Sequence, residues 1–578
     1  MFDGAIAAPA VVLPLHAFRP LLPLMLTVVA VLLAYDGSVV DVAATKRLSF
    51  HLAVATWGLV ALLRGWCGAR RPLSVALFVM VVTWALSGAL LAGASTAALL
   101  DKPLYYGVLA LALLLFREVV RSPATWPALV QFLTLCAVAL STATWVEVLV
   151  LGGEPRFSGA PVATLGNPNH LGAALVLLLP PVLALALHRA RDGRWWLVAS
   201  LLTSAVGLSG SYLAMLALLP VVLWLLGQRG LPWRMRWVAS ALLVAALAVG
   251  ALAPGAMGQR PATRPAAQVV GPGADRAAGD RGLARAFQGR LYLFARGMEA
   301  WGSAPWWGLG SGEYAWAFAA AQAEYLSETP DDLRFHTRQA HAHCDPLELL
   351  IEHGLLGLTL LVALWWWVRR RWGEGRAERR DWRLASWRWL GLGIFLWLSL
   401  GHFALYSPQV AVFGLIYGAM LFDFRLAVPR RLELALAGIA AGFMVLLLSL
   451  AVVNYEGERR LVRGLEALEA GAWTDADDHF SRAHRALPDG RALFYRGTLR
   501  LQEGDWVAAR ALLERAAYLL PFSEVHFNLA LALCATGERE AALQRLEIAS
   551  RLDPQQVGIE EAQRYCGGEG GLGGSAAP

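Results

Sequence analysis

Three histidines and three carboxylates lie together where a polar segment runs into an apolar one. Residues 338–357 read RQAHAHCDPLELLIEHGLLG. Asp345 is a good helix N-cap, Pro346 suits the first helical position, and Glu348 three residues after the cap completes a capping box. The sequence therefore predicts that a helix begins at Asp345, and that Asp345 and Glu348 serve chiefly to cap it.

His343 has the placement that a general base needs. It precedes the predicted helix N-terminus, where the positive end of the helix dipole disfavours a protonated imidazole. General-base catalysis requires the neutral form, although Asp345 acts in the opposite direction. His341, His343, Cys344 and Asp345 are also metal-ligand types, but their spacing matches no recognised metal signature. We therefore expect no metal here.

Glu352 follows Glu348 by four residues and so faces the same side of the predicted helix. It lies deeper in the apolar run, where an unpaired charge is costly. We therefore predict that Glu352 has a pairing partner or a functional role.

Polar groups elsewhere in the chain could bind an anionic substrate. Two asparagines flank a proline at a second predicted helix start, and helix N-termini favour anions. Arginines in the outer loops could bind phosphate oxygens in a bidentate manner. The substrate-binding candidates, together with His341 and Glu352, are Asn167, Asn169, Arg156, Arg290 and Arg296.

The elements that must hold these groups are predicted to be membrane helices. Of the 578 residues, 57% are hydrophobic and 16% charged, whereas a soluble domain is nearer a quarter charged. The net charge is +7, but the arginines lie beside apolar runs, which is typical of a membrane protein and disfavours a nucleic-acid partner. Apolar runs predict 12–13 spans, near 17–35, 50–64, 73–94, 103–116, 127–151, 170–187, 195–210, 211–227, 237–254, 347–368, 386–402, 408–424 and 432–453.

The distribution of positive charge favours one orientation. With a cytoplasmic N-terminus every inner loop is rich in arginine, whereas the short outer loops hold only Lys46, Arg47, Lys102 and Arg156. This orientation puts the outer loops 152–169 and 255–346 on the side of the candidate site. Spans and loops together form the predicted membrane domain, residues 1–455.

After the last span the chain becomes soluble in character and repetitive. Small residues and prolines recur every 33 residues between 456 and 556, as in Pro488, Pro521 and Pro554. This pattern resembles tetratricopeptide repeats. With thirteen spans the repeats lie outside the cytoplasm, and residues 557–578 form a flexible tail.

Taken together, these residues resemble the O-antigen ligase family, which also contains O-antigen polymerases and protein O-oligosaccharyltransferases. The ligase signature is a histidine, a small polar residue, nine residues and Gly-x-x-Gly. His343, Cys344 and the glycines of 354–357 have this spacing. Residues 166–169 look like the family's Gly-Asn-Pro-Asn stretch, and Arg290 looks like its loop arginine. The resemblance spans about 160–425, and tetratricopeptide repeats follow in many relatives.

The resemblance implies an all-α, GT-C-type glycosyltransferase in the bacterial inner membrane, with its active-site loop and repeats on the periplasmic side. Its donor would be a glycan on undecaprenyl pyrophosphate, transferred with inversion and without a cofactor. The acceptor hydroxyl would lie on lipid A–core sugar for a ligase in lipopolysaccharide biosynthesis, on a growing glycan for a polymerase, or on protein Ser/Thr. His343 would act as base or position the acceptor, Arg290 would bind pyrophosphate, and Glu352 and Asn167 would support the pocket.

Two residues depart from the family pattern. Cys344 stands where the family usually has Asn, Ser or Gln, and a thiol is a poorer hydrogen-bonding partner. Gly210 stands where an arginine often follows the serine, and Arg156 or Arg296 are candidates to replace it. Two other classes stay open, namely a transporter of lipid-linked sugars and a membrane-anchored scaffold that recruits a protein partner through the repeats. The polar groups crowd the outer face, which favours the enzyme.

Overall fold

The structure is a computed structural model, and every regular element in it is a helix, so the predicted all-α membrane bundle is confirmed for the described residues. It describes residues 15–36, 42–63, 96–120, 122–152, 160–188, 192–228, 231–253, 283–329, 337–372, 382–421, 430–486 and 490–568.

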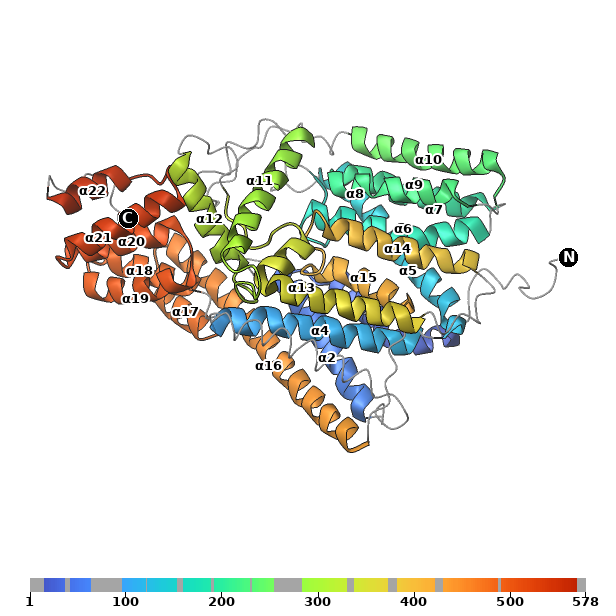
Figure 1. Cartoon of the computed structure of the whole chain (residues 1–578), viewed down its shortest axis with the longest axis horizontal. Coiled ribbons are helices and arrows are strands. Elements are labelled where there is room, and N and C mark those ends of the chain that lie inside the picture. The colour runs from blue at the N-terminus through green and yellow to red at the C-terminus, as the bar shows by residue number, and fades with distance from the viewer. Residues whose placement is uncertain are drawn as a thin grey trace.

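A bundle of helices lying alongside one another forms the larger part of the molecule (Figure 1). Helices occupy every span expected from hydropathy except 73–94, which lies outside the described residues. These helices are α1 (Leu22–Leu33), α2 (Val42–Leu63), α4 (Thr96–Val120), α5 (Trp126–Val146), α6 (Pro168–His188), α7 (Gly193–Leu208), α8 (Tyr212–Leu216), α9 (Leu218–Leu226), α10 (Trp233–Leu252), α13 (Asp345–Trp372), α14 (Trp382–Ser399), α15 (Pro408–Leu421) and α16 (Arg430–Glu469).

Four of the described helical segments are long and apolar enough to cross a bilayer by length and composition alone. Three shorter apolar helical segments accompany them, which fits a multi-pass membrane protein. The four are Pro123–Leu151, Pro168–His188, Trp233–Leu252 and Gly438–Glu469, and the three are Ala17–Leu33, Tyr212–Leu226 and Pro408–Leu421.

Helix α6 lies at the centre of the bundle core. Its residues from His170 to Leu183 are all buried, and it contacts α5, α7, α14 and α15. Helix α15 is buried almost throughout as well. Because α6 and α15 both start at the same end of the bundle, they hold the Asn-Pro-Asn segment beside the loop 400–407 that precedes α15.

Two lysines that were predicted from the sequence to lie in outer loops lie inside the helical bundle instead. Lys46 is on α2, fully buried, and donates from Nζ to the Leu32 carbonyl at 2.9 Å. Lys102 is on α4 and is also buried. A buried lysine in a membrane helix needs a partner, and the partners of Lys102 define the site described below.

Two helices of the long outer loop, α11 (Leu283–Gly302) and α12 (Tyr314–Glu328), cover one end of the bundle (Figure 1). Helix α11 packs against α13 and α12, and α12 contacts α21 of the C-terminal part. Residues 255–282 of this loop, expected to be its flexible part, lie outside the described residues.

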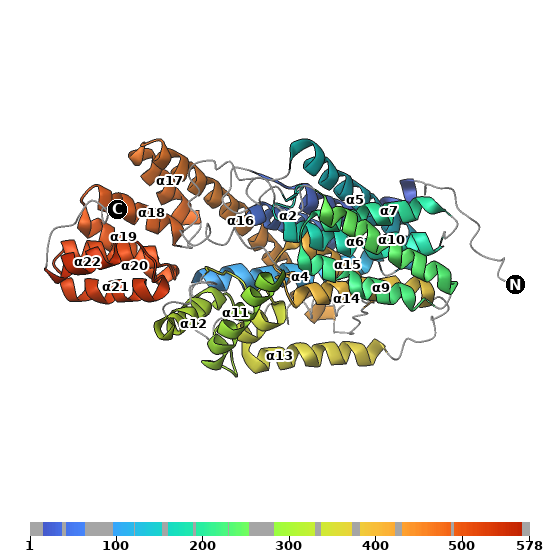
Figure 2. The same ribbon diagram turned by 90° about the horizontal axis from the view of Figure 1, so that it is seen from above.

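Helix α16 runs without a break through residue 455, where the sequence placed the end of the membrane domain. Further helices then pack one on the next in chain order beyond α11 and α12 (Figures 1 and 2). They are α17 (Trp473–Ala486), α18 (Arg491–Gln502), α19 (Trp506–Leu519), α20 (Ser523–Ala535), α21 (Arg539–Leu552) and α22 (Ile559–Gly567).

Candidate functional site

Helix α13 begins at Asp345, where the sequence predicted a helix start. The predicted capping roles are wrong, however. The Asp345 carboxylate accepts a hydrogen bond from the Leu405 amide at 3.0 Å, and so ties α13 to the loop before α15. The Glu348 carboxylate accepts from the Ala342 amide at 2.8 Å, outside the helix. Both side chains therefore hold the end of the bundle together instead of capping one helix.

Glu348 and Glu352 share one buried cation, Lys102 of α4. The Lys102 ammonium donates to Glu348 Oε1 at 2.5 Å and also to Glu352 Oε1. All three side chains are at least nine-tenths buried. The prediction that Glu352 has a pairing partner is confirmed, and the partner is a lysine 250 residues earlier in the chain. Breaking such a pair would leave an uncompensated charge, which costs about 3–5 kcal/mol.

His341 is held by the same network. Its Nδ1 lies 2.9 Å from Glu348 Oε1. Its ring stacks on Phe403 and on Tyr406, each with centroids 4.8 Å apart. A carboxylate at Nδ1 favours the tautomer that carries its proton there, so Nε2 is left as the acceptor atom.

His343 has a strained backbone, with φ at 52°. A histidine rarely adopts this left-handed conformation, and such strain gathers at functional sites. Its Nε2 lies 3.1 Å from Gln339 Oε1. Burial, and next the nearby positive charge of Arg290, lower the pKa of His343 to about 4, so its imidazole is neutral at pH 7.

Arg290 reaches the same end of the bundle from α11. Its Nε donates to the Gly401 carbonyl at 3.2 Å, and burial lowers the pKa of its guanidinium. Arg290 thus stands near enough to His343 for its charge to lower the pKa of the imidazole, and its role as a phosphate ligand stays a prediction.

The other predicted binding residues are placed differently. Arg296 pairs with Glu299 at 2.8 Å and stacks over Tyr325, so its guanidinium already has partners on α11 and α12. Asn167 accepts from the Asn169 amide at 2.8 Å and so caps α6, while the Asn169 side chain is exposed. Arg156 lies outside the described residues.

Two further histidines complete the site, and neither was assigned a role from the sequence. His170 on α6 contacts Ser407 Oγ at 3.1 Å and Gln409 Nε2 at 2.6 Å. The His402 ring lies 5.1 Å from that of His170. The signal was present, because His170 directly follows the Asn-Pro-Asn motif, but its partners are more than 200 residues away in the chain.

One phenylalanine brings these imidazoles together. The Phe403 ring lies 4.6 Å from that of His402, 4.8 Å from His341, 5.0 Å from His343 and 5.6 Å from His170, between ring centroids. The loop 400–407 thereby joins α6 to the segment before α13. The result is a histidine-rich site at one end of the bundle, in which His170 and His402 are buried, His341 and His343 are half-buried, and Arg290 lies beside them.

Two glycines explain why the loop turn before α12 lies against α13. Gly354 interrupts α13 with φ at 64°, and Gly308 has φ at 77°. A Cβ on Gly308 would lie 2.4 Å from the Glu352 carbonyl, and one on Gly354 would lie 2.3 Å from the Trp306 carbonyl. The turn donates from Gly310 N to the Glu352 carbonyl at 3.0 Å. The motif glycine Gly354 therefore docks the outer loop on the helix that carries Glu348.

The C-terminal helices contact the segment that carries the histidines. Arg338 pairs with Glu524 at the start of α20 and stacks on Phe522, with its guanidinium carbon 4.8 Å from the ring centroid. Helix α12 also contacts α21. Arg338 is only three residues before His341, so the C-terminal domain reaches the edge of the site.

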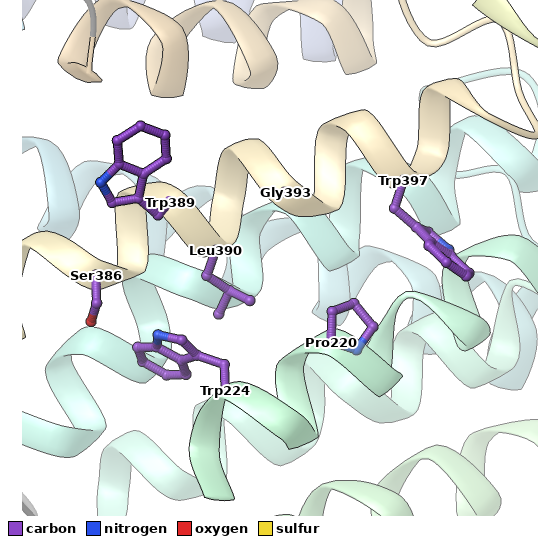
Figure 3. Close-up of a pocket in the computed structure, with 7 residues that line it drawn as sticks. All are labelled: Pro220, Trp224, Ser386, Trp389, Leu390, Gly393 and Trp397. Carbon is purple, nitrogen blue, oxygen red and sulfur yellow. The ribbon is translucent and has the colours of Figure 1, made fainter. Parts of the chain in front are cut away.

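An apolar groove lies between α9 and α14, with a volume of about 370 Å³ (Figure 3). In Figure 3, Leu390 of α14 extends toward α9, where Pro220 and Trp224 lie. The other residues that line the groove are Ser386, Trp389, Gly393 and Trp397 of α14. Helix α14 ends at Ser399, two residues before Gly401, whose carbonyl accepts the hydrogen bond from Arg290.

The fold and site define a polytopic membrane protein, all-helical in its described residues, with a histidine-rich site at one end of its bundle. Residues 196–362 match the family model described as O-antigen ligase, so this part of the chain is an O-antigen ligase domain. The match includes Arg290, His341, His343 and both glutamates of the site. No curated protein matches the chain.

Proposed function

We propose that this protein transfers a glycan from undecaprenyl pyrophosphate to an acceptor hydroxyl, most simply as an O-antigen ligase acting on lipid A–core sugar. The family is one of ligase- and polymerase-type transferases. The observation that carries the proposal is that His343 has a neutral imidazole and a strained backbone and lies near Arg290. A base and a cation for a leaving anion are the two groups that this transfer needs.

In the proposed reaction the acceptor oxygen attacks the anomeric carbon of the glycan. The bond from that carbon to the pyrophosphate oxygen breaks, and its electron pair leaves with undecaprenyl pyrophosphate. The hydroxyl proton passes to His343, and attack from the opposite face inverts the anomeric centre. Arg290 stabilises the charge that develops on the leaving group.

We place the protein in the bacterial inner membrane, with the site and the C-terminal helices on the periplasmic side. The inner loops are rich in arginine, which supports this orientation. The helices α17–α22 pack in sequence as tetratricopeptide repeats do, and their contact through Arg338 supports a role in presenting an acceptor or a partner protein.

The acceptor can be identified by an assay with purified full-length protein and a lipid-linked glycan. Three acceptors are offered separately: lipid A–core, a free glycan chain, and a Ser/Thr peptide. We expect the glycan to appear on lipid A–core. Product on the free chain would indicate a polymerase, and product on the peptide a protein O-oligosaccharyltransferase.

The groove between α9 and α14 fits the polyprenyl chain of the donor, because it is apolar and is lined by α14, which ends two residues before Gly401. Gly393 offers a way to test this, since a Cβ there has no atom within 4 Å. Gly393→Leu should fill the groove without a clash and raise KM for the lipid-linked donor about tenfold, which corresponds to about 1.4 kcal/mol of lost binding.

Gly442→Leu is the matched control, because Gly442 of α16 also has open space around its Cα and is exposed. Steady-state kinetics against donor concentration would measure both variants. An equal KM for the Gly393→Leu variant and the unaltered protein would show that the chain lies elsewhere.

A further inference from the structure

Glu348 and Glu352 are nearly equivalent in their bonds to Lys102, yet they differ in what else they hold. Both are fully buried on α13, one helical turn apart, and both accept from the same ammonium. Glu348 reaches the segment that carries the histidines, whereas Glu352 accepts from the Gly312 amide in the turn before α12. Glu348 contacts His341 Nδ1 at 2.9 Å and accepts from the Ala342 amide at 2.8 Å. Glu352 makes neither contact.

The two contacts of Glu348 fall on adjacent residues of the segment that ends in His343. The Ala342 amide is the peptide between His341 and Ala342, and Ala342 is itself fully buried. Fixing this amide restricts the chain just before the left-handed φ of His343. A strained conformation persists only where its surroundings over-determine it, and the carboxylate supplies such a constraint.

Lys102 supports the same histidine from a second direction. Its ammonium lies 4.7 Å from the centre of the Tyr406 ring, and that ring stacks on His341. Lys102 therefore contacts both the carboxylate that binds the His341 ring edge and the aromatic ring that packs on its face. A helix far from the catalytic segment in sequence, α4, thus contributes to the placement of both histidines.

We infer that Glu348, held in place by Lys102, is a positioning residue that fixes His341 and, through the Ala342 amide, the catalytic His343, whereas Glu352 balances charge without positioning either one. The inference rests on the proposed glycan transfer for its kinetic consequence. Its structural consequence, a fixed segment from 341 to 344, is independent of that function.

Glu348→Gln and Glu352→Gln form a matched pair for the test. Each removes one negative charge, and each leaves Lys102 with one glutamate, so the two variants have the same net charge. Only Glu348→Gln changes the contacts to His341 and Ala342. We expect Glu348→Gln to lower kcat for glycan transfer about a hundredfold with KM for the donor changed less than about threefold, since misplacement by about 1 Å has that effect. Glu352→Gln should lose far less.

A second readout separates this inference from the proposed function. Cys344 directly follows His343 and is 9% exposed, and burial raises the pKa of its thiol, so it should react slowly with a maleimide. Loosening the segment should raise the labelling rate of Cys344, followed by mass spectrometry, at least about tenfold in Glu348→Gln, because local opening exposes the thiol. Glu352→Gln should change that rate by less than about twofold if the segment stays closed.

Equal effects of the two variants on both readouts would overturn the inference, because both would then act only through the shared pair with Lys102. Faster labelling in Glu348→Gln with no transfer by the unaltered protein would support the positioning role and count against glycan transfer. If Glu348→Gln does not fold, Lys102→Arg and Lys102→Met provide the same comparison. The arginine should keep Glu348 in place and retain slow labelling, whereas methionine should not; fast labelling in both variants would contradict the inference.

Discussion

His343→Ala should lower glycan transfer by about a thousandfold or more, while the amount of protein in the membrane stays normal. The reason is that a positioned general base contributes about 10²–10⁴ in rate. The measurement is transfer by purified protein from a lipid-linked donor. His188→Ala, a change at the exposed end of α6, is the control and should transfer normally.

The backbone at His343 requires a second variant. Asparagine tolerates a positive φ better than alanine does, so His343→Asn keeps the local conformation and removes only the imidazole. It should be as inactive as His343→Ala. Undiminished transfer by either variant would contradict the role of His343 as base.

The same histidine sets an expected pH dependence. Its pKa is lowered to about 4, so the neutral, proton-accepting form is fully present at pH 7 and is lost only as the pH falls through about 4. Transfer should therefore hold between pH 7 and about pH 5.5, well above that pKa. A loss of activity centred near the ordinary histidine value of about 6.5 would show that a different, more exposed imidazole limits the reaction.

Arg290→Ala should have the second largest effect, a loss of about a hundredfold or more in kcat. Removing a cation that faces a developing charge typically costs this much. Arg290→Lys should recover part of the loss, because it restores the charge but not the Nε–H bond to the Gly401 carbonyl or the planar fork that fits a phosphate. Kinetics with each variant, and with Arg194→Ala as an exposed control, would measure these differences.

Arg296 lies on the same helix as Arg290. Its substitution tests whether transfer depends on Arg290 specifically or on positive charge in general. Arg296 is already paired with Glu299 and stacked on Tyr325. Arg296→Ala should therefore cost less than Arg290→Ala. An equal or greater loss would move the pyrophosphate contact from Arg290 to Arg296.

The helical bundle could be predicted from sequence because hydropathy reports burial directly. Runs of apolar residues correspond to helices wherever the chain is described, and the start of α13 at Asp345 follows from its Asp-Pro pair. The site could be predicted only in part. His343 and Arg290 could be recognised from the sequence, because a histidine and an arginine in the outer loops are unusual in a protein whose positive charge is otherwise in the inner loops.

The remaining contacts depend on tertiary pairing that no local pattern encodes. Glu348 has the spacing of a helix cap, and only the approach of Lys102, 246 residues away, gives it a different role. Lys102 itself lies at the edge of an apolar run and so has the pattern of a loop residue. Gly354 belongs to a motif, but its function in docking the turn at Gly308 follows only from the fold. The assignment of tetratricopeptide repeats to the C-terminal helices stays a prediction.

The central claim is that a glycan leaves its lipid pyrophosphate carrier on this protein. The most direct measurement is the release of undecaprenyl pyrophosphate by the purified full chain in lipid nanodiscs, given a lipid-linked glycan and an acceptor but no nucleotide sugar. We predict one undecaprenyl pyrophosphate released for each glycan that appears on the acceptor, and none with His343→Ala. A donor that stays intact, or is only moved across the membrane, would contradict the account and favour a transporter.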